Sequence, residues 1–370
     1  MKSKQKSVFC VLLVLTLLVP FSLRPLASAP DFTGEPLRFN EDGSFRILQI
    51  TDTQDTQWPS PNLLTMIQKA LDESKPDLVV FTGDQLKNYD SDFDGPNVEW
   101  KVRQALRLIV EPIVRRGLPF AFAFGNHDSC LSVTLEEQVA YLQTFPGCLV
   151  VDEGSSVTGC GNYNLPVISS DGARTAFNLY FLDSGQDMVQ PDQVDWYVSK
   201  SDELREANGG VPVPSFEFQH IIAYNDNLIN AFAQQGDVIA SFCGHDHYRT
   251  DTVENNGVNF VHTPTAGFNA FGPGKEVGVR VIDVFEDDPE NYETSILTFI
   301  DLLGDNPITD LRFTLFTLGE MEGTPIEIVA GLIPKIALCL SYAFQQAEGS
   351  PPAFAFMVLE FFGVDVRYIW

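Results

Sequence analysis

Hydrophobic positions along the chain alternate between short continuous apolar runs and segments in which apolar residues recur every three or four positions. The short runs predict buried strands at residues 44–50, 77–82 and 118–124. Between and after them, helical spacing of apolar residues predicts helices at 61–74, 98–116 and 135–144. Further strands are predicted at 175–182, 215–222, 238–242, 259–262 and 278–285. This alternation of strands and helices predicts an α/β fold.

The first 29 residues have the composition of a secretory signal peptide. Lys2, Lys4 and Lys6 precede an apolar stretch at 8–23 and the small residues 27–29, which is the order found in such signals. The rival interpretation is a retained signal anchor, but the apolar stretch is short for a membrane span of about 20 residues. We expect cleavage near residue 29 and export of the mature chain out of the cell, to a vacuole or to the endomembrane lumen.

The last part of the chain, residues 304–370, carries no recognisable chemistry. Its apolar stretch 326–344 contains Glu327, Pro334 and Lys335, and charges and a proline are costly inside a bilayer. We expect a packed amphipathic appendage of unknown role and no stable membrane span. The domain plan is therefore a signal peptide at 1–29, a main domain at 40–303 and the appendage at 304–370. The sequence leaves the oligomeric state open.

The formal net charge of −27 bears on the class of partner. Proteins that bind nucleic acids usually present a basic surface, because they neutralise phosphate charges. This acidic chain is therefore not expected to bind nucleic acid.

Five cysteines follow the signal region, and an export signal would permit disulfides. Cys148 and Cys160 flank a loop rich in Gly and Ser and are the first candidate pair. Cys130 and Cys243 each lie two residues from a candidate site residue and form a second candidate pair. Buried free thiols are the alternative for both pairs.

Histidine is scarce in the chain, and four of the five histidines lie in three short segments at 125–128, 218–220 and 244–247. Two aspartate segments, at 50–54 and 82–84, precede them. Each segment falls where a predicted strand gives way to a loop, which is where ligands bind in open α/β sheets. Carboxylates, imidazoles and an amide in this number are the ligands that a pair of metal ions requires, and two ions about 3.5–4 Å apart can activate water and neutralise phosphoryl oxygens.

The order of these segments resembles that of the calcineurin-like metallophosphoesterases, a superfamily that includes purple acid phosphatases. Segments 161–166, 179–185 and 242–247 are similar to the branch often labelled purple acid phosphatase 28/29-like, which is also similar to a yeast phosphatase of cell-cycle control. The resemblance covers about residues 45–303 and not the appendage. It implies a four-layer αββα sandwich, to which the C-terminal appendage is added, and a dinuclear centre with Mn, Fe or Zn.

The resemblance also implies a role for each candidate residue. Asp84 would bridge the two metal ions. Asp52, Gln54 and His247 would complete the first site, and Asn126, His220 and His245 the second. His127 would protonate the leaving group or stabilise phosphoryl charge, and Asp128 would fix its orientation. The reaction would be attack of a metal-bridging hydroxide on a phosphomonoester, either a small phosphoester or a phosphoprotein.

Two departures from the family pattern stand out. Gln54 occupies a position where the family usually has His, and its neutral amide oxygen favours Mn, Mg or Fe(II) over Zn. The alternative is that Gln54 does not ligate and the site is degraded. Lys87 stands where a purple acid phosphatase has Tyr, and Tyr89 is out of register, so no tyrosinate colour is expected.

Contacts to the substrate are poorly marked. Lys87 and Arg249 are candidates for holding a phosphate oxygen, and His262 is a candidate pocket residue. Solvated loop charges are the equally supported alternative for Lys87 and Arg249. Two rival functions stay open: a phosphodiesterase or nucleotidase on the same scaffold, and a pseudo-enzyme that only binds a phosphorylated ligand or a partner protein.

Overall fold

The structure is a computed structural model that describes residues 34–89, 93–130, 132–152, 156–223 and 225–317. The predicted signal peptide and most of the predicted appendage lie outside the described residues. Within the described ranges, no helix is both long and apolar enough to cross a lipid bilayer.

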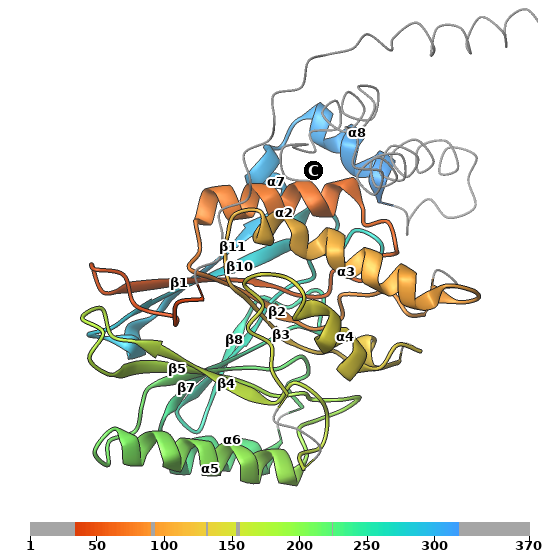
Figure 1. The fold of residues 1–370 in the computed structure, drawn as a ribbon. Helices are drawn as coiled ribbons and strands as arrows, with labels where there is room; N and C mark the ends of the chain where they lie inside the picture. The colour runs from red at the N-terminus through yellow and green to blue at the C-terminus, as the bar shows by residue number, and fades with distance from the viewer. Residues whose placement is uncertain (1–33, 90–92, 131, 153–155, 224, 318–370) are drawn as a thin grey trace, which may run out of the picture.

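Two β-sheets are stacked face to face in the middle of the molecule (Figure 1). The first sheet has the order β11-β10-β1-β2-β3 and contains β1 (Ser44–Ile50), β2 (Leu78–Thr82), β3 (Phe120–Ala123), β10 (Gly278–Phe285) and β11 (Glu293–Thr298). The second has the order β4-β5-β6-β7-β9-β8 and contains β4 (Tyr163–Ile168), β5 (Thr175–Phe181), β6 (Ser215–Phe218), β7 (Val238–Cys243), β8 (Thr252–Asn255) and β9 (Val258–His262). Strands β1, β2 and β3 run parallel, as do β5, β6, β7 and β9.

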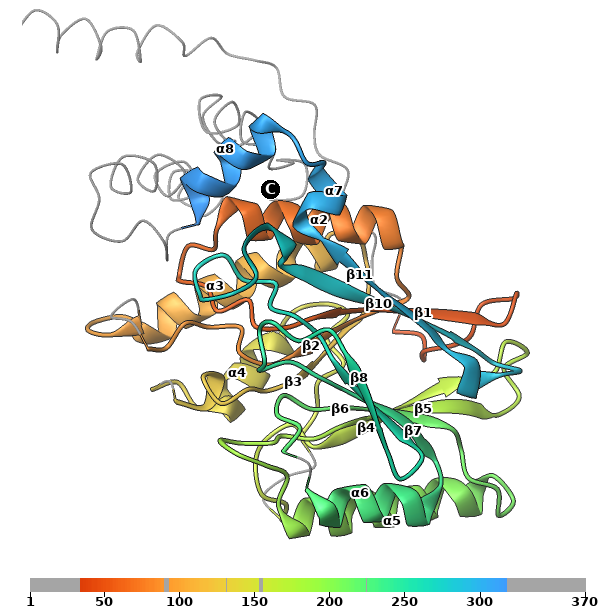
Figure 2. The same ribbon diagram turned by 180° about the vertical axis from the view of Figure 1, so that it is seen from behind.

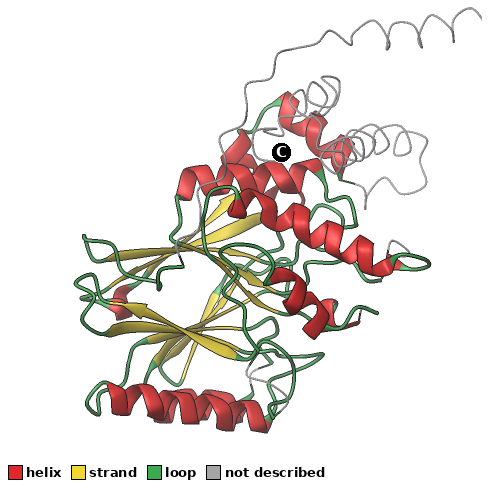
Figure 3. Ribbon diagram, in the orientation of Figure 1, coloured by secondary structure: helices red, strands yellow, loops and turns green. Residues whose placement is uncertain are grey.

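Helices cover the outer face of each sheet, which gives four layers (Figures 1 and 2). Helices α2 (Pro61–Ser74) and α3 (Val98–Val114) cover the first sheet, and α5 (Pro191–Ala207) and α6 (Asp226–Gln235) cover the second. The smaller helices are α4 (Leu135–Leu142), α7 (Phe299–Leu303) and α8 (Pro307–Phe316). Figure 3 shows the same helix–sheet–sheet–helix order by secondary structure. The predicted αββα sandwich is confirmed.

Aromatic side chains fill the space between the two sheets. From the first sheet, Phe81 stacks on Phe122 with ring centroids 4.4 Å apart. From the second sheet, Phe218 stacks on Phe181 and Phe242 at 5.3 and 5.5 Å. All five rings are fully buried. Because both faces of the first sheet are covered, its inner strand β2 and the neighbouring β3 are continuous apolar runs rather than alternating ones.

Helix α2 shows how local sequence and tertiary packing combine. The Ser60 side chain accepts a hydrogen bond from the Asn62 backbone N–H, and Pro61 opens the first turn, so the start of the helix is capped. Helix α8 then packs over this end: the Arg312 guanidinium donates to the Thr65 hydroxyl and to the Pro61 carbonyl. At least this first helix of residues 304–370 therefore packs on the sandwich.

Neither predicted disulfide forms, because Cys148, Cys160 and Cys243 are free thiols. Cys148 lies beside β3 and forms an isolated backbone β-bridge with Phe120. Cys160 lies just before β4 of the second sheet, and its backbone N–H donates a hydrogen bond to the Asp183 carboxylate. The two cysteines, close together in the sequence, thus lie beside strands of different sheets. The alternative interpretation, free thiols, holds for these three residues.

Candidate metal centre

The loops that follow five strands of the two sheets meet at one edge of the sandwich. These strands are β1, β2, β3, β6 and β7, and the loops after them carry Asp52, Gln54, Asp84, Asn126, His127, Asp128, His220, His245 and His247. Because parallel strands of a sheet end at the same edge, residues far apart in the sequence come together there. The five sequence segments predicted to share a site are therefore neighbours in the structure.

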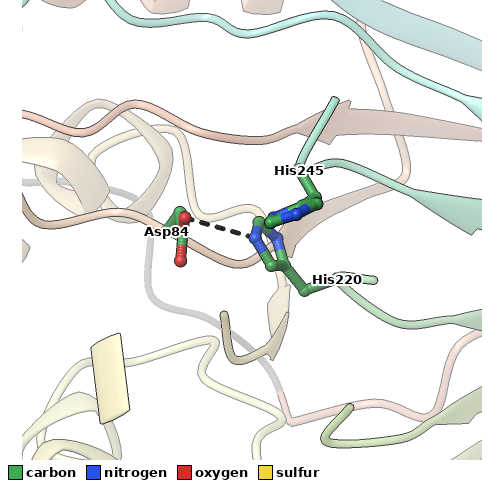
Figure 4. Close-up of side chains that lie close together, drawn as sticks. All are labelled: Asp84, His220 and His245. Atoms are coloured by element: carbon green, nitrogen blue, oxygen red, sulfur yellow. Dashed lines mark ion pairs between the residues drawn. The ribbon is translucent and has the colours of Figure 1, made fainter. Parts of the chain in front are cut away.

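Asp84, His220 and His245 form a compact group whose potential ligand atoms all lie within 4.8 Å of one another (Figure 4). The His220 Nε2 atom is 3.2 Å from Asp84 Oδ2 and 3.9 Å from Asp52 Oδ1. His247 extends the group, with its Nε2 atom 3.3 Å from Asp52 Oδ1. Two buried carboxylates thus lie among three imidazoles.

The two buried histidines are oriented by backbone carbonyl groups. The Nδ1 atom of His220 is 2.7 Å from the Thr82 oxygen, and that of His247 is 2.5 Å from the Phe271 oxygen. A carbonyl oxygen can only accept, so each Nδ1 carries a proton, and Nε2 is the nitrogen that faces the carboxylates and is left to bind a metal ion. This is the arrangement in which histidine ligates a metal ion.

Three buried polar atoms of the cluster have no hydrogen-bond partner within the described residues: Asp52 Oδ1, Asn126 Oδ1 and His220 Nε2. Unpaired buried polar atoms are uncommon in proteins because each costs about 1–3 kcal/mol. Two oxygens and one imidazole nitrogen are ligands that suit divalent metal ions. The donors present therefore fit a metal centre.

Backbone strain is concentrated in the same loops. Asp52, Gln54, Asp84 and His245 have φ angles of 50°, 35°, 55° and 69°, a region that costs a non-glycine residue about 1–3 kcal/mol. Hydrogen bonds hold these turns, including those from the Asp52 and Gln54 N–H groups to the Gly83 and Asp84 carbonyls. Such strain clusters at functional sites.

Two glycines allow the loops to approach one another. A Cβ atom on Gly125 would collide with the Asp84 carboxylate, and one on Gly244 would collide with the Thr51 hydroxyl and the Asp52 carboxylate. The glycines of the Gly-Asn-His-Asp and Gly-His-Asp-His segments are therefore required by close packing against the two aspartates.

The electrostatics of the cluster favour positive charge between the carboxylates. Burial disfavours the imidazolium of His220, but the Asp84 and Asp52 carboxylates outweigh it and raise its pKa to about 10. Burial likewise opposes the charged Asp84 carboxylate, yet His220 and His127 lower its pKa. The pKa of His245 is lowered by burial and by the neighbouring His220. A buried site that retains ionised carboxylates suits cations.

Gln54 differs from its predicted role as a ligand. Its Nε2 donates to Asp84 Oδ2 at 3.0 Å, and its Oε1 accepts from the Tyr89 hydroxyl at 3.1 Å. The atom that could bind a metal ion therefore faces Tyr89, and the amide would have to turn over to ligate. The Tyr89 ring also packs edge-on against the His127 ring, with centroids 5.1 Å apart.

Asp128, predicted to fix the orientation of His127, is hydrogen-bonded to the backbone of two loops. Its carboxylate accepts hydrogen bonds from the backbone N–H groups of Asp84 (2.7 Å), Gln85 (3.0 Å) and Gly125 (3.0 Å). It therefore stabilises the two loops that carry candidate ligands and does not orient His127. Instead, the Nδ1 atom of His127 contacts Asn88 Oδ1. The sequence signal for Asn88 is only that it follows Asp84 on the same loop, four residues on.

The two phosphate-binding candidates have different surroundings. Arg249 forms ion pairs with Asp251 at 2.7 Å and with Asp246 at 3.5 Å. The Nζ atom of Lys87 lies 5.2 Å from the centre of the Tyr89 ring, at the side of the site.

His262 is buried behind the cluster, where its Nδ1 is 3.3 Å from the Cys243 sulfur. Burial lowers its pKa. The residue packs against the end of β7 rather than into the ligand group.

Comparison with known proteins places this arrangement in a family. Residues 45–249 match the model of the calcineurin-like phosphoesterase family, and the chain belongs to that family. Its fold and its group of potential metal ligands agree with that membership.

Individual relatives share about a quarter to a third of their aligned residues with this chain. The chain is similar to the Arabidopsis thaliana protein named "Probable inactive purple acid phosphatase 14", with 26% identity over 69% of this chain and 79% of the relative. It is 30% identical to phosphatase DCR2 of Saccharomyces cerevisiae over 42% of this chain and 29% of that one. A solved dimetal phosphatase from Danio rerio aligns with 69% of this chain and 99% of its own, at 12% identity and a TM-score of 0.46.

Proposed function

We propose that this protein hydrolyses phosphomonoesters at a two-metal centre. The observation that carries the proposal is the group of unpaired buried atoms, Asp52 Oδ1, Asn126 Oδ1 and His220 Nε2, at the meeting point of the strand ends. Two further observations support it: the imidazole Nε2 atoms face the carboxylates, and strained backbone is concentrated in the same loops.

The proposed ligands follow from this geometry and from the family pattern. Asp84, which contacts both His220 and Gln54, would be the carboxylate shared by the two ions. Asp52 and His247 would hold one ion, and Asn126, His220 and His245 would hold the other. Mn, Fe or Zn, when bound, acidifies water and neutralises charge on the phosphoryl oxygens.

His127 is the proposed acid for the leaving group. Its backbone N–H donates to Asp84 Oδ1 at 2.8 Å and its Nδ1 contacts Asn88, while its Nε2 atom lies 3.8 Å from Asp84 Oδ2, at the edge of the ligand group. The ring is partly exposed, unlike His220. As the ester bond breaks, the Nε2 proton passes to the departing oxygen, which leaves as an alcohol.

A non-catalytic function is the main alternative, and one specific observation favours it. Gln54 donates an N–H to the proposed bridging carboxylate instead of offering an oxygen. The Arabidopsis relatives also carry the word inactive in their names. A protein with one weakened half-site would bind a phosphorylated ligand without turning it over.

The experiment that tests the proposal is hydrolysis of p-nitrophenyl phosphate by the purified chain, titrated with Mn, Fe and Zn, beside bis(p-nitrophenyl) phosphate. Turnover of the monoester that rises with metal and disappears in Asp84→Asn is expected. Asp202→Asn, an exposed carboxylate paired with Arg205 on α5, is the matched control. Faster hydrolysis of the diester would show that the protein is a phosphodiesterase and not a phosphomonoesterase. Absence of turnover from folded, metal-loaded protein would favour the binding function.

Export and domain organisation stay part of the proposal. We propose that residues 1–29 direct the chain into the secretory route and that residues 40–303 form the catalytic domain. Sequencing the amino terminus of the protein from its native cells tests this, because a mature chain beginning near residue 30 is expected. A chain that retains Met1 in the cytosol would contradict it.

A further inference from the structure

Beside the metal centre lies a pocket of about 370 Å³. It is within the range of small-molecule sites, which extends from about 300 to 1,000 Å³. Three aromatic side chains at its mouth are exposed, namely Tyr89, Tyr248 and Phe271. Large aromatic side chains rarely gather on a free surface without a binding role. Phe268, Asn269 and Lys87 also line it.

Two walls of the pocket are shared with the metal centre. The Phe271 ring stacks on the His247 ring with centroids 4.1 Å apart and planes inclined by 12°. Its carbonyl group also accepts the hydrogen bond that orients His247. On the other side, the Tyr89 hydroxyl donates a hydrogen bond to Gln54, and the Tyr89 ring packs against His127. A molecule whose phosphoryl group reaches the cluster therefore has the rest of its body beside these rings.

The pocket is built rather than formed by chance contact of surface loops. Phe268 and Asn269, which line it, are each 1% exposed. The Asn269 amide nitrogen is fixed by the Asp55 carboxylate, whereas its Oδ1 atom is buried with no hydrogen-bond partner in the described part of the chain. Lys87 brings a positive charge to the wall next to Tyr89.

We infer that this pocket holds a flat aromatic ring carried by the leaving group of the substrate, packed against Phe271, Tyr248 and Tyr89. The inference rests on the proposed function, since it names the substrate class of the same site. Stacked and edge-on ring pairs contribute about 0.5–1.5 kcal/mol beyond area burial, which corresponds to a preference of roughly two- to tenfold over an aliphatic group of similar size. The ring belongs either to an aryl phosphate, such as a phosphotyrosine side chain, or to the base of a nucleoside monophosphate.

Binding of non-hydrolysable analogues tests the pocket without turnover. Calorimetry with phenylphosphonate and cyclohexylphosphonate, on the metal-loaded full-length chain, is expected to give a roughly two- to tenfold tighter Kd for the flat ring. Tyr248→Ala and Phe271→Ala should bring that ratio close to one, whereas Phe271→Tyr should keep it. Val211→Ala, which truncates an exposed side chain on the loop before β6, is the control that keeps the wild-type ratio.

Metal content is measured for each variant, because Phe271 also touches His247. A ratio that falls only when metal is lost would contradict a pocket for the ring. Equal affinity for the two phosphonates in the wild type would overturn the inference outright.

Turnover then distinguishes the two sources of the ring and separates this inference from the proposed function. A higher kcat/KM for O-phosphotyrosine than for phosphoserine that Phe271→Ala removes assigns an aryl phosphate, and a higher value for adenosine monophosphate than for glycerol 2-phosphate that Phe271→Ala removes assigns a nucleotide. Hydrolysis of all four at similar rates overturns the ring pocket and leaves the phosphatase. A ring preference in binding with no turnover of any ester overturns the phosphatase and leaves the pocket.

Discussion

The hydroxyl group of Tyr89 donates a hydrogen bond of 3.1 Å to the amide oxygen of Gln54. Gln54 in turn donates to Asp84 at 3.0 Å, so a neutral chain of two hydrogen bonds ends on the central carboxylate. A histidine at position 54 would place a lone pair where Gln54 places an N–H group. Gln54, which the resemblance marks as a departure from the family pattern, is therefore held by Tyr89 with its amide N–H toward Asp84.

The first prediction follows from that pair. Gln54→His should raise metal affinity by about tenfold or more, since even changes in groups that only hydrogen-bond to a ligand alter affinity by roughly 10- to 100-fold. Tyr89→Phe should raise metal affinity less, because the loss of the Tyr89 hydroxyl only frees the Gln54 amide to turn over. Metal content at limiting metal, measured by mass spectrometry, checks both. Unchanged metal content in Gln54→His would show that Gln54 is not the residue that limits binding.

A second prediction concerns metal removal. Because bound ions stabilise the native state by mass action, a chelator should lower the Tm, and added Mn should restore it. His220→Asn removes the proposed Nε2 ligand in the fully buried part of the cluster. The Tm of this variant should therefore be the same in chelator and in Mn. Differential scanning calorimetry with and without metal measures this. A Tm in the wild type that does not respond to metal would contradict the ligand assignment.

A third prediction concerns Asn88. Its side chain holds the Nδ1 side of the His127 ring, so Asn88→Ala should lower kcat by about 10- to 100-fold with little change in KM. The loss should be larger for phenyl phosphate than for p-nitrophenyl phosphate, because the poorer leaving group needs the proton more. Asn88→Asp should recover part of the rate. An equal loss for both esters would assign Asn88 a role in folding the loop instead.

A fourth prediction is a pH dependence of stability due to Glu217 on β6. Burial raises the pKa of this carboxyl to about 8, while Ser241 and Gln219 partly offset it. Between the unfolded value of about 4.3 and pH 8 the native state binds a proton that the unfolded chain has released, so stability falls as pH rises through this window.

Glu217→Gln mimics the protonated acid and should flatten this slope. The Tm of the variant should exceed that of the wild type by several degrees at pH 8 and match it below about pH 4, where both native and unfolded Glu217 are protonated. Thermal unfolding in chelator, across this pH range, measures the difference without interference from metal release. Parallel Tm curves for the two proteins would contradict the raised pKa.

The strands and helices that border the site could be predicted from the sequence. The runs at 44–50 and 61–74 coincide with β1 and α2, because continuous apolar strands and amphipathic helices leave strong local patterns. Strands β4, β8 and β11 were missed, since all three lie at sheet edges and contain polar or exposed residues that interrupt the apolar pattern. The predicted strand at 215–222 ends at Phe218, where the chain leaves the sheet and brings His220 into the site.

The sequence by itself determined the family and the inventory of candidate ligands. Each motif is local, a Gly, Asp, Asn or His immediately after an apolar run, so no knowledge of packing is needed to find it. Only the tertiary structure decided which atoms these residues face. Gln54 meets Tyr89 across 35 residues, His247 meets the Phe271 carbonyl across 24, and Asp128 turns to the backbone of Asp84 rather than to the neighbouring His127. Such contacts depend on how loops from two stacked sheets approach one another, and packing between sheets leaves no periodic signal in the chain.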